Sequence, residues 1–130
     1  MNNILLAQRV RSWEESVQLV GGPLVESGDI SRSYLEAIIR VNRTYGPYSV
    51  VAPHIALLHA KPTDGVRNLY LGLLILKDGV EFGAPKFDAV NLVFILGIPD
   101  SHSHLRALND LASIIRTRSV YQSLRQCASA

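Results

Sequence analysis

The sequence lacks several features that mark whole classes of protein. It has one cysteine, Cys127, in 130 residues, which excludes an internal disulfide or a cysteine-rich zinc site and suits a reducing compartment. The place of Cys127 near the C-terminus favours a spectator thiol over a nucleophile. The longest apolar runs, 69–76 and 92–98, are far shorter than the roughly 18 to 20 residues that span hydrocarbon. Because the first ten residues carry no readable secretory or transit signal, we expect a cytoplasmic protein.

An excess of charge of one sign is also missing. Thirteen basic and eleven acidic side chains leave a net charge of +2, and the basic ones are spread singly along the chain. A nucleic-acid-binding surface usually needs a basic stripe with interleaved aromatic residues, so no nucleic acid partner is expected. With 48% apolar and 18% charged residues, the composition is that of a folded protein. The length is that of one ordinary domain, and residues 1–130 are interpreted as a single one.

Helical patterns lie at both ends of the chain. A capping box that begins at Ser12 predicts a helix towards Gly28, within which Gly21-Gly22-Pro23 predicts a kink or a split. Ser31 can cap a second helix that ends at Gly46-Pro47. The same kind of pattern predicts a third helix from Ser101 or Ser103 and a short last one over 119–126.

Between these helices the hydrophobic pattern changes to that of strands. Four short runs rich in aliphatic and aromatic residues are bounded by turn residues and predict strands over 48–52, 55–60, 68–76 and 90–98. Because these runs are apolar throughout, each strand is expected to be buried on both faces. The sequence therefore predicts an α/β fold with a mixed sheet of about four to five strands sandwiched between helices.

The candidates for chemistry are four histidines, which fall into the pairs His54 with His59 and His102 with His104. In extended backbone, a separation of five residues would place the rings of His54 and His59 on opposite faces and roughly 16 Å apart, so they would not share a site. His102 and His104 lie at a predicted start of a helix, where backbone N–H groups favour an anion. A single histidine is more often structural than catalytic, so spacing alone leaves these roles open.

Other kinds of site find little support. The sequence has no glycine-rich phosphate loop and no Gly-x-Ser-x-Gly elbow, which argues against a nucleotide cofactor and a serine hydrolase. Zinc bound by histidines with Asp88 or Asp100 stays a rival hypothesis, that of a metal-dependent hydrolase, but no histidine pair has the i, i+4 spacing of a helical metal motif. Arg40 and Arg43 on the second predicted helix are expected to be solvated and are weak candidates for a site.

Several short motifs occur in an order that is more specific than any one of them, over about residues 12–115. They are Tyr34-Leu-Glu-Ala-Ile-Ile39, Gly46-Pro-Tyr48, Ala52-Pro53, Ile55-Ala56 with His59-Ala60, Pro62 with Gly65-Val66, Gly79-Val80 with Phe82-Gly83, and Asp100 with His104-Leu105. In these motifs the chain resembles the enzyme IIA components of the phosphoenolpyruvate-dependent sugar phosphotransferase system, mannitol-fructose type. The likeness is greatest to the ascorbate-like branch.

The resemblance implies that His59 is the phosphate-accepting histidine and that His104 is its neighbour in the active site. It implies a cytoplasmic phosphotransferase component with a phosphohistidine intermediate. Such a component takes phosphate from the histidine-containing phosphocarrier protein and passes it to a cysteine of an enzyme IIB for coupled sugar uptake. The membrane is involved only indirectly, through an enzyme IIC, and neither a cofactor nor a metal is implied. The alternative is a regulatory or non-transferring binding module; the sugar and a homodimer are left open.

Two residues depart from the family pattern. Leu58 stands where the family usually has proline just before the acceptor, which frees a backbone N–H. His54 stands where the family usually has glycine. In a straight strand His54 would lie on the face opposite His59, whereas a turn at Pro53 would fold it over the site. The first arrangement is expected, and with it a working carrier.

Overall fold

The computed structural model describes residues 2–47, 49–60, 65–68 and 70–97, together with residues 109, 110, 113, 122, 123 and 126. Within this part of the chain the elements are β1 (Asn2–Ala7), α1 (Trp13–Ser27), α2 (Arg32–Tyr45), β2 (Val50–Ala52), β3 (Ile55–Leu58), β4 (Tyr70–Val80) and β5 (Val90–Gly97). None of the described helices is long and apolar enough to cross a membrane.

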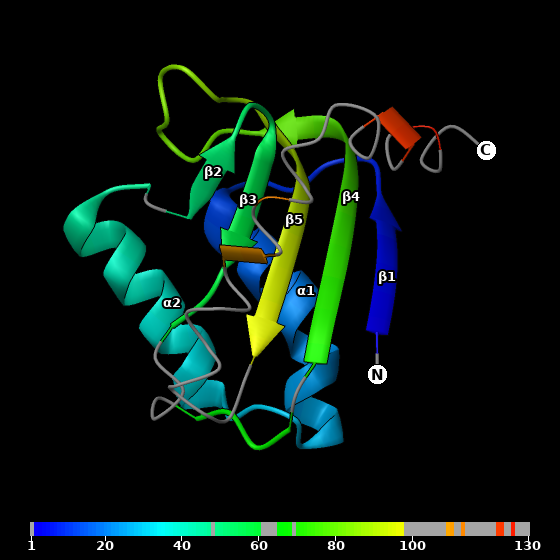
Figure 1. Ribbon diagram of the computed structural model, residues 1–130, viewed down its shortest axis with the longest axis vertical. Helices are drawn as coiled ribbons and strands as arrows, with labels where there is room; N and C mark the ends of the chain where they lie inside the picture. The colour runs from blue at the N-terminus through cyan, green and yellow to red at the C-terminus, as the bar shows by residue number, and fades with distance from the viewer. Residues whose placement is uncertain are drawn as a thin grey trace.

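The five strands form one mixed sheet in the order β1-β4-β5-β3-β2 (Figure 1). β1 runs parallel to β4 and β3 parallel to β5, whereas the pairs β4–β5 and β2–β3 are antiparallel. β5 comes last among these strands in the chain and lies at the centre of the sheet, buried along its whole length. The predicted α/β fold with a mixed sheet is confirmed.

The edge strand β1 was not among the predicted strands. Its side chains alternate: Ile4 and Leu6 are 64% and 60% exposed, while Leu5 and Ala7 pack against the core. This alternation is the period of a strand with one buried face. It spans too few residues to predict a strand from the sequence, in which this segment is only a small apolar patch.

The strand β4 is longer than predicted, because Asp78-Gly79 does not end it. The pairing of β4 with β5 is irregular between Ile75 and Val80, as at a β-bulge. A Cβ on Gly79 would lie 2.9 Å from the Cβ of Ala89 and 3.1 Å from the carbonyl oxygen of Val90. Gly79 therefore marks a close approach of two strands and not a turn.

The two described helices begin and end where the sequence predicts. The Ser12 side chain accepts a hydrogen bond from the Glu15 N–H at 3.2 Å, as expected for the N-cap of α1. Gly28 ends the same helix in the left-handed conformation, with φ of 85°. Gly21 and Pro23 lie inside α1, which continues through them, so the predicted split does not occur. Gly21 instead faces Leu35 of α2, leaving room for the two helices to pack closely.

Each face of the sheet carries an apolar cluster. The first joins the inward residues of α1 and α2 to one face of the strands and includes Val20, Leu24, Tyr34, Ile38, Leu58, Leu74 and Ile95. The second lies on the opposite face and includes Ile55, Leu57, Leu73, Ile75, Leu92 and Phe94. Because alternate strand residues belong to different clusters, both faces are apolar, as predicted. The helices predicted after residue 100 fall largely outside the described residues.

Candidate functional site

His59 directly follows β3, and its ring is held against its own strand. The side chain is half-buried, and its Nδ1 lies 2.9 Å from the carbonyl oxygen of Leu57. A carbonyl only accepts hydrogen bonds, so Nδ1 carries the proton of the neutral ring and Nε2 carries the lone pair. In the neutral ring of His59, Nε2 is therefore the basic nitrogen.

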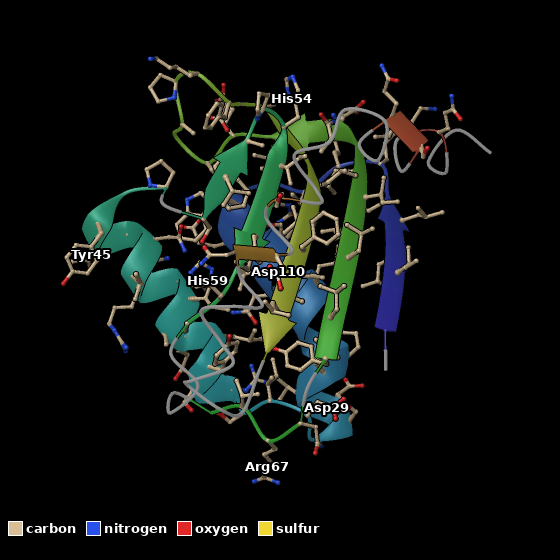
Figure 2. The ribbon with its side chains drawn as sticks, viewed as in Figure 1. Asp29, Tyr45, His54, His59, Arg67 and Asp110 are labelled. Atoms are coloured by element: carbon tan, nitrogen blue, oxygen red, sulfur yellow. The ribbon has the colours of Figure 1, made fainter. Side chains whose placement is uncertain are left out.

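The residue after His59 is also anchored. The Ala60 N–H donates to the Tyr34 hydroxyl at 3.1 Å, and this hydroxyl donates to the Leu96 carbonyl at 2.7 Å. Tyr34 lies on α2, so the helix is tied to the chain just beyond the histidine. Figure 2 shows His59 on the side of the sheet next to this helix.

Leu58, which directly precedes His59, is a core residue of β3. Its side chain is fully buried in the cluster formed with α1 and α2. Leu58 pairs with Ile95 in the parallel ladder of β3 and β5. Leu58 therefore continues the strand up to His59 with a packed side chain.

A second anchor lies where the chain returns after residue 64, and we call it the Asp29 junction: Ser27, Asp29, Ser31, Gly65 and Asn68. The Asp29 carboxylate accepts from the Ser27 hydroxyl at 2.8 Å and from the Asn68 amide at 3.0 Å. These two hydrogen bonds, that of Ser27 first, hold the pKa of Asp29 below its ordinary value. The Ser31 N–H donates to the Gly65 carbonyl at 2.8 Å. Residues 65–68 are thereby fixed to the connection between α1 and α2.

His54 lies at the other end of β3 from His59 (Figure 2). Its backbone N–H donates to the Phe87 carbonyl at 2.8 Å, and its Nδ1 donates to the Ala89 carbonyl at 2.8 Å. His54 and His59 lie apart, as predicted, but the extended backbone expected at His54 was wrong. The chain turns at Pro53 and His54 and is not extended there. The turn directs the His54 ring towards the start of β5.

The backbone of His54 has a conformation that glycine would adopt more easily. Its φ is 68°, in the left-handed region that L-residues with a side chain avoid. The hydrogen bond from Nδ1 to Ala89 offsets part of this unfavourable conformation. From the sequence, His54 was identifiable as a bulky replacement, but neither its backbone angle nor its partner was.

The remaining predicted site residues divide into two groups. His102, His104, Asp100 and Cys127 lie outside the described residues. Asp88, a candidate zinc ligand, accepts hydrogen bonds from the backbone N–H groups of residues 82, 83 and 84 at 2.7 to 2.9 Å. Its carboxylate therefore organises a loop. Within the described residues no cluster of three metal-binding side chains occurs.

Arg40 and Arg43 are exposed on α2, as predicted. Arg43 forms an ion pair of 3.2 Å with Glu14 of α1, and at this exposure such a pair contributes little to stability. Both arginines line a shallow depression of about 400 Å³ together with Glu36, Ile39 and Thr44. The depression is open, with mixed polar and apolar walls.

Comparison with known proteins gives a consistent result. The family model described as "Phosphoenolpyruvate-dependent sugar phosphotransferase system, EIIA 2" matches residues 1–130. The ascorbate-specific PTS system EIIA component of Salmonella choleraesuis is 27% identical over 130 residues, which cover 99% of this chain and 84% of that protein. The match of the family model includes both ends of β3 and all seven described elements.

Two solved structures from Escherichia coli have a similar fold. The mannitol-specific cryptic phosphotransferase enzyme IIA superposes with a TM-score of 0.77 at 26% identity, over 94% of this chain and 80% of that one. The mannitol enzyme IIA in complex with phosphorylated enzyme IIB superposes with a TM-score of 0.79 at 22% identity, over 95% and 85% of the two chains. With the match over residues 1–130, this chain belongs to the EIIA 2 family of the phosphoenolpyruvate-dependent sugar phosphotransferase system.

Proposed function

We propose that this chain is a cytoplasmic phosphocarrier that accepts a phosphoryl group on Nε2 of His59 and passes it on for coupled sugar uptake. The donor is the histidine-containing phosphocarrier protein and the acceptor is a cysteine of an enzyme IIB. The observation that carries the proposal is the hydrogen bond of 2.9 Å from Nδ1 of His59 to the Leu57 carbonyl. Because Nδ1 donates in this bond, the lone pair of the neutral ring is on Nε2. The side chain is half-buried and directly follows the buried strand β3.

The reaction is a pair of phosphoryl transfers. In the first, the bond between phosphorus and the donor's histidine nitrogen breaks as Nε2 of His59 bonds to phosphorus. In the second, that bond breaks as a cysteine sulfur of enzyme IIB takes the phosphoryl group. Transfer of this kind depends mainly on the alignment of the two reacting atoms and on stabilisation of charge.

The Leu57 carbonyl contributes to both requirements. Its hydrogen bond to Nδ1 fixes the orientation of the ring, and so fixes the direction in which the Nε2 lone pair points. As Nε2 bonds to phosphorus, the ring gains positive charge, and the hydrogen bond from Nδ1 to a carbonyl oxygen then becomes stronger. On the family resemblance, His104 is proposed as a donor to the phosphoryl oxygens. The mannitol enzyme IIA complex supports enzyme IIB as the class of partner.

The first prediction tests the acceptor. The purified chain is incubated with phosphoenolpyruvate, the first enzyme of the relay and the phosphocarrier protein, and its intact mass is measured. We expect a gain of about 80 Da, the mass of one phosphoryl group, and a label lost in mild acid but kept in alkali. His59→Ala should remove the label and leave the fold intact, because the side chain is only half-buried.

The matched control is His54→Gly, which removes a half-buried histidine at the other end of β3 and should leave labelling in place. A label that persists in His59→Ala would contradict the assignment of the acceptor. A wild-type chain that folds but gains no mass would contradict transfer itself and favour a regulatory binding module.

A further inference from the structure

The hydroxyl of Tyr34 connects three elements at the place where the β3–β5 ladder stops. Tyr34 is fully buried on α2, and its hydroxyl donates to the Leu96 carbonyl at 2.7 Å and accepts from the Ala60 N–H at 3.1 Å. The last ladder pair of these two strands is Leu58 with Ile95. Beyond that pair, the Tyr34 hydroxyl bridges Ala60, which follows β3, and Leu96 of β5.

His59 lies between these two connections. Its preceding residue, Leu58, is fixed by the ladder, and its following residue, Ala60, is fixed by Tyr34. The ring itself is held to Leu57. On the basis of the function proposed above, we infer that Tyr34 is a positioning residue for His59. In this role it acts by fixing the backbone from which the imidazole projects.

The loss of this hydroxyl would have a local effect. Ala60 and Leu96 are both buried, so removal of the phenol oxygen leaves a buried N–H and a buried carbonyl without this partner. The backbone relieves that penalty when Ala60 shifts towards other partners, and His59 moves with it. Because transfer depends on the line between Nε2 and phosphorus, a small shift reduces the rate more than it reduces binding of the donor.

Tyr70 supplies a matched control at the same end of the sheet. It is as buried as Tyr34, being 1% exposed, and pairs with Gly97 next to Leu96. Among the described residues its hydroxyl has no hydrogen-bond partner. Tyr70→Phe therefore removes a buried phenol oxygen close to Tyr34 without breaking a hydrogen bond.

The second prediction compares Tyr34→Phe with Tyr70→Phe in single-turnover transfer from the phosphorylated phosphocarrier protein. We expect Tyr34→Phe to become labelled on His59, with the maximal transfer rate constant reduced tenfold or more and the half-saturating donor concentration unchanged. Tyr70→Phe should transfer at the wild-type rate. The Nδ1 proton of His59, followed by NMR without any phosphate donor, should exchange faster or shift in Tyr34→Phe alone.

Equal rates in both phenylalanine variants, or an unchanged Nδ1 proton in Tyr34→Phe, would overturn the role of Tyr34. If the wild-type chain is not phosphorylated, the proposed function fails, while the Nδ1 proton still decides whether Tyr34 holds the ring. If Tyr34→Phe does not fold, hydrogen exchange of the Ala60 amide in the wild-type chain decides. Protection of that amide by a hundredfold or more supports the bridge, and exchange near the rate of an unstructured amide overturns it.

Discussion

At the scale of single residues, the two histidines that flank β3 have opposite roles although both are half-buried and hydrogen-bonded through Nδ1. His59 directly follows β3, and its ring bonds to a carbonyl of that strand two residues back. His54 bonds to a residue 35 positions away and lies in a turn at φ of 68°. The first arrangement orients a ring at the end of a strand, and the second holds two loops together.

The third prediction concerns the backbone of His54. His54→Ala keeps the left-handed conformation and loses the hydrogen bond to Ala89, so it should lower the free energy of unfolding by about 1 to 2 kcal/mol. His54→Gly also loses the bond, but glycine adopts a positive φ without strain. This variant should therefore lower the free energy of unfolding by about 1 kcal/mol less than His54→Ala does. Urea unfolding of both variants measures this difference.

The same variants test the separation of the two histidines. Labelling of His59 should be nearly unchanged in both, because the His54 ring faces Ala89. A tenfold drop in the labelling rate, about 1.4 kcal/mol of transition-state stabilisation, would show that His54 contributes to transfer after all.

The sequence was sufficient to single out His59 as a candidate and to place Tyr34 in a family motif, but not to show which hydrogen bonds hold the two side chains. His59 stands at the end of an apolar run within a family motif, which is local information. The partners of the Tyr34 hydroxyl lie 26 and 62 residues away. Hydrophobic periodicity shows that a side chain is buried, and carries no information about which distant carbonyl its polar atom will meet.

At the scale of elements, the contact between α1 and α2 depends on one glycine of a pair. A Cβ on Gly21 would collide with the side chain of Leu35, whereas a Cβ on Gly22 would meet open space. Sequence alone could not distinguish a kink from a close helix contact, because both are typical of glycine within a helical pattern.

The fourth prediction uses this pair of neighbours. Gly21→Ala should lower the free energy of unfolding by about 1 to 3 kcal/mol, because the buried Leu35 side chain must move to admit the methyl group. Gly22→Ala should raise it by about 0.5 to 1 kcal/mol, because alanine favours a helix and no atom lies in its way. Urea unfolding compares them, and equal effects of the same sign would contradict the close packing at Gly21.

The Asp29 junction joins the end of α1 to residues 65–68, which precede β4. Its contribution to stability depends on the ionisation of Asp29 and therefore on pH. The pKa of Asp29 is lowered from 3.8 by the hydrogen bonds of Ser27 and Asn68. A carboxyl group whose pKa is depressed by folding stabilises the fold above the unfolded pKa, and this contribution is lost as the pH falls through the folded pKa.

The fifth prediction follows from that sign. At pH 7, Asp29→Asn should be less stable than the wild type, and the difference should shrink as the pH falls below about 3.8, the ordinary value given for this group. Denaturant midpoints over this range measure it. Asp78→Asn, which removes an exposed carboxylate on β4, is the control. A difference between wild type and Asp29→Asn that stays constant with pH would contradict the role of the ionised carboxylate.

At the scale of the whole molecule, the sequence predicted which segments are strands better than how they are ordered. Four of the five strands were recognisable from their apolar runs, with bounds that differ by a few residues from those of the structure. The order β1-β4-β5-β3-β2 was not predictable, since a strand that is apolar on both faces does not indicate its neighbours. Pairs such as Leu5 with Leu74 join segments that are far apart in the chain.

The central position of β5 has a consequence for how the chain is made. A ribosome adds about 5 to 20 residues per second, so several seconds separate β1 from the strand that completes the sheet. During that time β3 has no parallel partner, and β1, with Ile4 and Leu6 on its outer side, awaits β4. The nascent chain therefore presents unpaired apolar strands to the cell until residue 97 has emerged, and early release of the chain would yield a substrate for chaperones and proteases in place of a partly folded carrier.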